Sequence, residues 1–142
     1  MFSLSHIHPM LVHFPIALVA VGFLADLISL FFKKEACLTK VGLFLLVVGT
    51  LSAMAALLSG LLFTTDLEGT AGEVMENHEL FAWITVSILV VTSVLRIFIL
   101  RTNRESTNLK WVAFALYALA AVSVSVTGFL GGSLVYNYMM PL

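Results

Sequence analysis

Four long apolar stretches dominate the chain, and short polar segments separate them. Long apolar runs cover 10–32, 41–63, 80–100 and 111–130. Each run reaches the roughly 20 residues that a helix needs to cross the hydrocarbon core of a membrane. Because hydrocarbon offers no hydrogen-bond partners, the backbone of a spanning segment must satisfy itself, which predicts helices. With their more polar ends included, the predicted helices cover about 9–32, 41–63, 71–100 and 111–136.

The composition supports a membrane protein. Of the 142 residues, 61% are hydrophobic and 11% are charged, and the mean hydropathy is +1.08, far above that of an ordinary soluble domain. We therefore predict an all-α integral membrane protein, a single domain over 1–142 folded as a four-helix up-down bundle. The first run ends in lysines instead of a small-residue cleavage site, which argues against a signal peptide.

The charges are divided between the two ends of this predicted bundle. All seven basic residues lie in or beside the first and third connections: Lys33, Lys34, Lys40, Arg96, Arg101, Arg104 and Lys110. The positive-inside rule places those connections in the cytoplasm. Both termini and the acidic middle segment, 64–79, then lie on the periplasmic side of a bacterial inner membrane. All four histidines fall on that outer side: His6, His8, His13 and His78.

Two prolines shape the start of the first helix, where three of the histidines lie. Pro9 suits the first helical position and favours an extended His8 before it. Pro15 lies inside the helix, cannot donate to Leu11, and predicts a kink near His13. Five residues separate His8 from His13, which is about 140° around a regular helix. One cofactor could hardly take both from one straight helix.

Two formal charges, Asp26 and Arg96, lie inside the apolar runs at matching depth. An unpaired charge in lipid is costly, so we predict an ion pair between the first and third helices. The second helix carries small residues at heptad and four-residue spacing, including Gly42, Gly49 and Gly60. Small residues allow close approach of a neighbouring helix or of a flat cofactor.

Three motifs resemble a bacterial family of small four-helix membrane proteins of unknown function. They are "HPMLVHFPIAL" near the N-terminus, "NHELFAW" in the third helix and "GGSLVYNY" near the C-terminus. The resemblance covers nearly the whole chain and implies a redox setting with haem b, because members are sometimes fused to cytochrome c or Rieske iron-sulfur domains. The family pattern falls on these residues: His8, Pro9, His13, Phe14, Pro15, His78, Gly131, Gly132 and Tyr136.

A haem b electron-transfer protein or redox subunit is therefore the first hypothesis. The first and third helices are diagonal in an up-down bundle, so one histidine from each can bind a haem from opposite sides. We favour His13 with His78, and His8 is the alternative ligand. Phe14, Phe81 and Trp83 are expected to pack on the haem, and Tyr136 to hydrogen-bond a propionate. A second haem needs a further ligand, such as one from a neighbouring protomer in a homo-oligomer.

The second hypothesis is a copper or zinc site. His8, His13 and His78 supply three nitrogen ligands, as in open zinc sites. Four methionines lie on the same side, where thioethers favour Cu(I): Met10, Met75, Met139 and Met140. A cofactor-free accessory subunit of a larger membrane complex is the third hypothesis.

Other classes of function find little support in the residues. The chain has neither a GxSxG nucleophile elbow nor a phosphate-binding GxxxxGK motif, and an electron carrier or subunit is favoured over a stand-alone enzyme. The few basic residues flank helices as topology signals, which disfavours nucleic-acid binding. The expected partners are the lipid bilayer and a periplasmic cytochrome c or another redox subunit.

Overall fold

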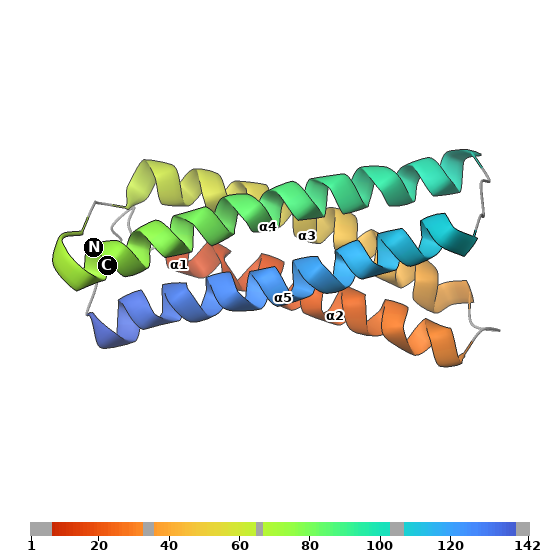
Figure 1. Cartoon of the computed structure of the whole chain (residues 1–142), viewed down its shortest axis with the longest axis horizontal. Coiled ribbons are helices and arrows are strands. Elements are labelled where there is room, and N and C mark those ends of the chain that lie inside the picture. Colours follow the sequence, from red (N-terminus) through yellow and green to blue (C-terminus); the bar gives the residue numbers. More distant parts are fainter. Residues whose placement is uncertain (1–6, 33–35, 65–66, 103–106, 139–142) are drawn as a thin grey trace.

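The structure is a computed structural model that describes residues 7–32, 36–64, 67–102 and 107–138. The described residues form one short helix and four long ones (Figure 1): α1 (Ile7–Leu11), α2 (His13–Phe31), α3 (Ala36–Phe63), α4 (Gly69–Thr102) and α5 (Thr107–Asn137). The long helices run alternately up and down the same axis, and α2 packs mainly on α3, as α4 does on α5. This arrangement makes α2 and α4 diagonal and confirms the prediction of an all-helical protein.

The first predicted helix is divided in two. The helix begins at Ile7, two residues before Pro9, and is interrupted at Val12. Pro9 still lies in the first turn, where its missing N–H removes no hydrogen bond within the helix. The Val12 N–H donates to the His8 carbonyl at 3.1 Å, whereas Pro15 has no N–H for Leu11. The helix is thus interrupted close to the position where the sequence predicts a kink. The prediction that His8 is extended is wrong, because His8 lies within α1.

The outward surface of the bundle is largely apolar. Four helical segments, Ile7–Phe31, Cys37–Phe63, Gly69–Thr102 and Asn108–Asn137, are long and apolar enough to cross a membrane. Large hydrophobic side chains are exposed on each, such as Phe44 (66%), Val94 (61%) and Phe129 (74%). In water this surface would be unstable, but lipid tails solvate it without cost.

Small residues bring α2 and α3 close together. A Cβ atom on Gly49 would lie 3.0 Å from the Val19 Cγ2 atom, and Val19 itself is fully buried. The central core consists of Val19, Leu46, Ala53, Leu89, Tyr117, Ala120 and Val124. Hydroxyl pairs cross this core, including Thr50 with Ser93 at 2.8 Å and Thr85 with Ser123 at 2.7 Å. These pairs satisfy polar groups that hydrocarbon cannot.

The predicted ion pair forms between the diagonal helices α2 and α4. Both guanidinium Nη atoms of Arg96 donate to the Asp26 carboxylate, and the Nη2–Oδ1 distance is 3.2 Å. The remaining two helices close around the pair. Gly42 of α3 leaves room for the carboxylate, which a Cβ there would meet. Tyr117 of α5 lies with its ring centroid 5.9 Å from the guanidinium carbon.

Replacing Arg96 by alanine should destabilise the bundle by about 3–5 kcal/mol, because it leaves the Asp26 carboxylate buried without a partner. The double variant Asp26→Leu with Arg96→Met should recover most of this loss, since it removes both charges. Thermal unfolding of the detergent-purified protein measures both effects. Arg101→Ala, at an exposed position on the same helix, is the control. An Arg96→Ala protein as stable as this control would contradict the structural role of the pair.

Candidate functional site: a paired-histidine cavity

A cavity of about 580 Å³ opens at the end of the bundle where α1, the end of α3, the start of α4 and the end of α5 meet. On the α3 side its lining reaches inward from Thr64 to Ala53, a separation of eleven residues or about 16 Å along the helix axis. Its walls are mostly apolar, and the polar side chains that line it are His8, His13, Thr64, His78, Glu79, Thr85, Thr127 and Tyr136. Such a cavity matches the size and character of ordinary ligand sites.

His8 is fixed by two groups on α3. Its Nδ1 atom lies 3.0 Å from the Ala56 carbonyl oxygen and 3.0 Å from the Ser59 Oγ atom. The Ser59 hydroxyl donates to the same Ala56 carbonyl at 2.7 Å. A carbonyl oxygen only accepts, so the His8 Nδ1 atom carries the proton. The Nε2 atom of His8 is left with a free lone pair.

His78 is held in the same manner by α5. Its Nδ1 atom lies 3.0 Å from the Thr127 carbonyl oxygen, so Nδ1 is again the donor and Nε2 again carries the lone pair. The Thr127 hydroxyl belongs to a separate cluster, since it donates to the Ser123 carbonyl at 2.9 Å and lies 3.1 Å from the Thr85 hydroxyl. The ring of His78 is therefore oriented from the backbone.

Each imidazole rests on a glycine four residues beyond the carbonyl that it binds. A Cβ on Gly60 would lie 3.1 Å from His8 Cε1, and a Cβ on Gly131 would lie 3.0 Å from His78 Cε1. The spacing is the same in both cases, Ala56 with Gly60 and Thr127 with Gly131. A helical carbonyl already accepts from the N–H four residues ahead. A glycine at that position leaves space for a ring to reach the second lone pair of the carbonyl.

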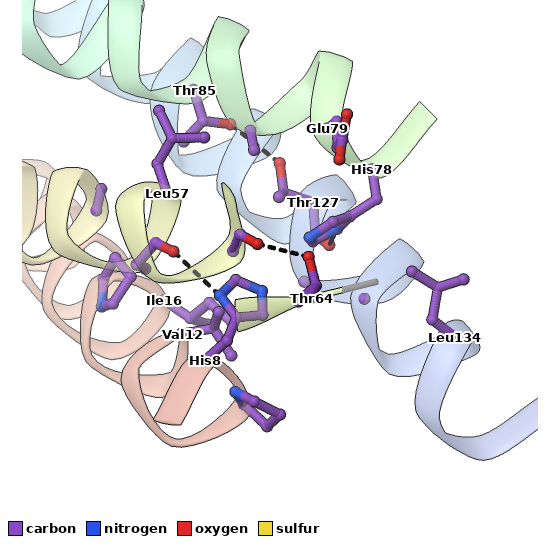
Figure 2. Close-up of a pocket in the computed structure, with 18 of the residues that line it drawn as sticks. His8, Val12, Ile16, Leu57, Thr64, His78, Glu79, Thr85, Thr127 and Leu134 are labelled. Atoms are coloured by element: carbon purple, nitrogen blue, oxygen red, sulfur yellow. Dashed lines mark hydrogen bonds between the residues drawn. The ribbon is translucent and has the colours of Figure 1, made fainter. Parts of the chain in front are cut away.

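The imidazoles of His8 and His78 face one another across the cavity. Their ring centroids are 6.2 Å apart, and the ring planes are inclined at 79°. Figure 2 shows His8 and His78 reaching in from opposite sides, His8 from α1 and His78 from α4. The topology thus unites two histidines that are 70 residues apart, through backbone contacts on the other two helices.

His13 lies at the edge of the cavity. It is exposed, and its Nδ1 atom donates to the Pro9 carbonyl of its own helical turn at 2.6 Å. The expected partnership of His13 with His78 is replaced in the structure by that of His8 with His78. Because positions 8 and 13 differ by about 140° around a regular helix, the two imidazoles point in different directions.

The other predicted site residues are placed differently. Phe14 and Trp83 are 59% and 52% exposed and do not line the cavity, because both project from the outward faces of α2 and α4. Tyr136 lines the cavity edge and is 85% exposed. His6 lies outside the described residues, as do Met139 and Met140. Within the described ranges, no three His, Cys, Asp or Glu side chains gather as metal ligands, so the three-histidine set is not assembled.

Sequence reasoning missed the groups that orient the rings. Ser59 and the carbonyls of Ala56 and Thr127 were not predicted as parts of a site, although Gly60 belongs to the small residues noted on the second helix. The signal was a glycine four residues after a residue whose carbonyl faces the bundle axis, repeated on the second and fourth long helices. This pattern does not identify the site from the sequence alone, because a glycine that makes room for an imidazole looks the same as one that makes room for a neighbouring helix.

The donor set and the cavity suit a flat cofactor bound by two imidazoles. A metal-binding histidine commonly donates its Nδ1–H to a backbone carbonyl, which fixes the orientation of the ring. Gly132 lines the cavity with open space where a Cβ would be, so bare backbone is available for close contact. Both observations fit a planar ring system lying between His8 and His78.

Comparison with known proteins agrees with the membrane-spanning architecture. The family described as "Predicted membrane protein (DUF2231)" matches residues 5–141. A search of curated proteins found no match, and a search of solved structures found none either.

We expect ¹⁵N NMR of histidine-labelled protein to show His8 and His78 protonated at Nδ1 and not at Nε2. Gly131→Ala should disturb this pattern for His78 alone, because the added Cβ enters the space of its ring. Gly132→Ala is the matched control, since its Cβ meets no atom within 4 Å. Signals of an Nε2-protonated His78 in the unaltered protein would contradict the assigned hydrogen bonds.

Proposed function

The chain belongs to this family of predicted membrane proteins of unknown function, and from that premise we propose that it is a haem b electron-transfer protein or redox subunit. His8 and His78 are the proposed axial ligands. The observation that carries the proposal is the pair of facing imidazoles, each with Nδ1 held by a carbonyl and Nε2 free. Histidines are normal axial ligands of haem iron.

The separation of the rings supports two ligands on one metal. A metal–nitrogen bond is about 2 Å long, and the ring centroid lies about 1 Å further out, so opposed imidazoles have centroids about 6 Å apart. The observed 6.2 Å agrees with this value. Two imidazole nitrogens would complete the coordination of a haem iron, whose ring would supply the other four ligands.

The surrounding residues have distinct roles in this proposal. When bound, the haem would supply one-electron redox chemistry at its iron. The Ala56 and Thr127 carbonyls orient the imidazoles and increase their basicity as ligands. Ala53, Leu57 and Val86 form apolar walls that keep water from the ring, and such burial tunes the iron potential.

The proposal also includes an orientation in the membrane. The basic residues within the described ranges lie toward the opposite end of the bundle from His8 and His78: Lys40, Arg96, Arg101 and Lys110. This separation favours a periplasmic cavity and periplasmic termini in a bacterial inner membrane. Electron exchange would then take place with a periplasmic cytochrome c or with another redox subunit. A site near the outer face shortens the path to such a partner.

Copper is the second candidate, because one thioether lies on the same cavity. Met75 is buried, lines the cavity, and precedes His78 by one helical turn. Two imidazole nitrogens and a thioether sulfur are ligands that Cu(I) accepts. Zinc is less favoured, since its sites usually hold three or four nitrogen, sulfur or carboxylate ligands.

We expect the protein purified from haem-replete cells to show a Soret band and a reduced alpha band that respond to dithionite. His8→Ala and His78→Ala should each abolish the six-coordinate spectrum, because each removes one axial nitrogen. His13→Ala, at an exposed position beside the same cavity, should keep the spectrum at saturating haem and is the matched control.

A preparation that stays colourless after haem reconstitution would overturn the haem proposal. Metal analysis of that sample would then separate copper binding, with loss in Met75→Leu, from a cofactor-free accessory subunit. Loss of the spectrum in His13→Ala with retention in His8→Ala would contradict the ligand assignment and restore the pair expected from the sequence.

A further inference from the structure

Three hydroxyl side chains meet between α4 and α5 at the wall of the cavity. The Thr85 Oγ1 atom lies 2.7 Å from the Ser123 Oγ atom and 3.1 Å from the Thr127 Oγ1 atom. Thr85 and Ser123 are buried, with 3% and 5% exposure, and Thr85 and Thr127 both line the cavity. A buried hydroxyl among apolar side chains must find its hydrogen-bond partner within the protein. The three hydroxyls therefore depend on one another.

The directions of these hydrogen bonds follow from the number of hydrogens. The Thr127 hydroxyl donates to the Ser123 carbonyl at 2.9 Å, and each hydroxyl has a single hydrogen to donate. The Thr127 oxygen must then accept the hydrogen of Thr85, and the Thr85 oxygen must accept that of Ser123. The chain of donors thus runs from Ser123 through Thr85 to Thr127, and all three hydrogens are used.

Thr127 contacts α4 through two different groups. Its carbonyl accepts the Nδ1–H of His78 at 3.0 Å, and its hydroxyl accepts that of Thr85 at 3.1 Å; Figure 2 shows Thr127 between these two side chains. His78 and Thr85 are seven residues apart, so they lie on one face of α4 and about 10 Å apart along its axis. One hydrogen bond alone would let α4 turn or slide against the Thr127 carbonyl. The second bond, two turns further along, opposes both movements.

We propose that Thr127 is a positioning residue for His78, and that its hydroxyl, held by Thr85, fixes the plane in which the His78 imidazole faces the cavity. His8 is supported in another way, because its Nδ1 atom contacts the Ser59 hydroxyl directly at 3.0 Å. The importance of this support for an axial ligand rests on the proposed haem function. The support itself follows from the contacts alone and is present without a ligand.

The test removes the Thr127 hydroxyl and keeps the carbonyl. In ligand-free, histidine-labelled protein in detergent, Thr127→Val should make the His78 Nδ1–H exchange with water roughly fivefold to tenfold faster, the factor that corresponds to one ordinary hydrogen bond. Thr127→Ser keeps the hydroxyl and should keep the exchange rate of the unaltered protein. NMR measures this rate, and the Nδ1–H of His8, which is held on α3, should not change in either variant.

A second variant tests the partner of the hydroxyl. Thr85→Val should accelerate the exchange as much as Thr127→Val does, and the double variant should add little, because both changes remove the same bond. Ser125→Ala is the matched control, since Ser125 is exposed on the same helix and its hydroxyl donates to the Ala121 carbonyl of that helix at 2.8 Å.

The haem-loaded protein gives an independent readout. Thr127→Val should replace a single low-spin electron paramagnetic resonance signal by several overlapping ones, because the plane of the His78 ring is no longer unique, whereas Thr127→Ser should keep the single signal. Unchanged exchange in Thr127→Val and Thr85→Val, or an equal acceleration in Ser125→Ala, would overturn the positioning role. If the unaltered protein binds no haem, the haem proposal is wrong, and the exchange rates still decide the role of Thr127.

Discussion

The candidate site depends on two hydrogen bonds from imidazole to helical backbone, those from His8 to Ala56 and from His78 to Thr127. Helical carbonyls in a hydrocarbon environment are normally saturated by their own helix and covered by the side chain four residues ahead. Gly60 and Gly131 remove that cover. The two glycines thus convert ordinary helical carbonyls into acceptors for a side chain from another helix. Because a carbonyl cannot donate, the same contacts decide which ring nitrogen is free.

The diagonal helices are joined at two levels by different means. At one end the α1 and α4 histidines meet across a cavity, and at the other the α2 and α4 side chains Asp26 and Arg96 form an ion pair. In both places α3 and α5 contribute the surroundings: small residues that make room, together with Tyr117 beside the ion pair. The closed end holds charges that neutralise each other and fill their space. The open end holds nitrogen lone pairs beside a cavity, and this contrast is the reason why we propose it as the binding end.

The sequence predicted the helices and the ion pair because both follow from the cost of polar groups in hydrocarbon, which depends on run length and depth. It did not predict which N-terminal histidine faces inward. That choice depends on where the helix begins and where it is interrupted, which are Ile7 and Val12. The two prolines do not fix the first residue of the helix, which lies two residues before Pro9. Nor did it place Phe14 and Trp83, because lipid accepts an aromatic side chain as readily as a cofactor does. In a membrane bundle, the apolar character of a side chain is therefore a poor guide to whether it faces the cavity or the lipid.

The central claim is that His8 and His78 bind one metal with nearly perpendicular ring planes, held by carbonyls on separate helices. Electron paramagnetic resonance of the oxidised, haem-loaded protein tests it most directly. Two perpendicular imidazoles on ferric haem leave its lowest orbitals nearly degenerate, so the account predicts one strongly anisotropic low-spin signal, as expected for planes at 79°. A high-spin signal, or the ordinary rhombic low-spin signal of parallel imidazoles, would contradict the geometry described above.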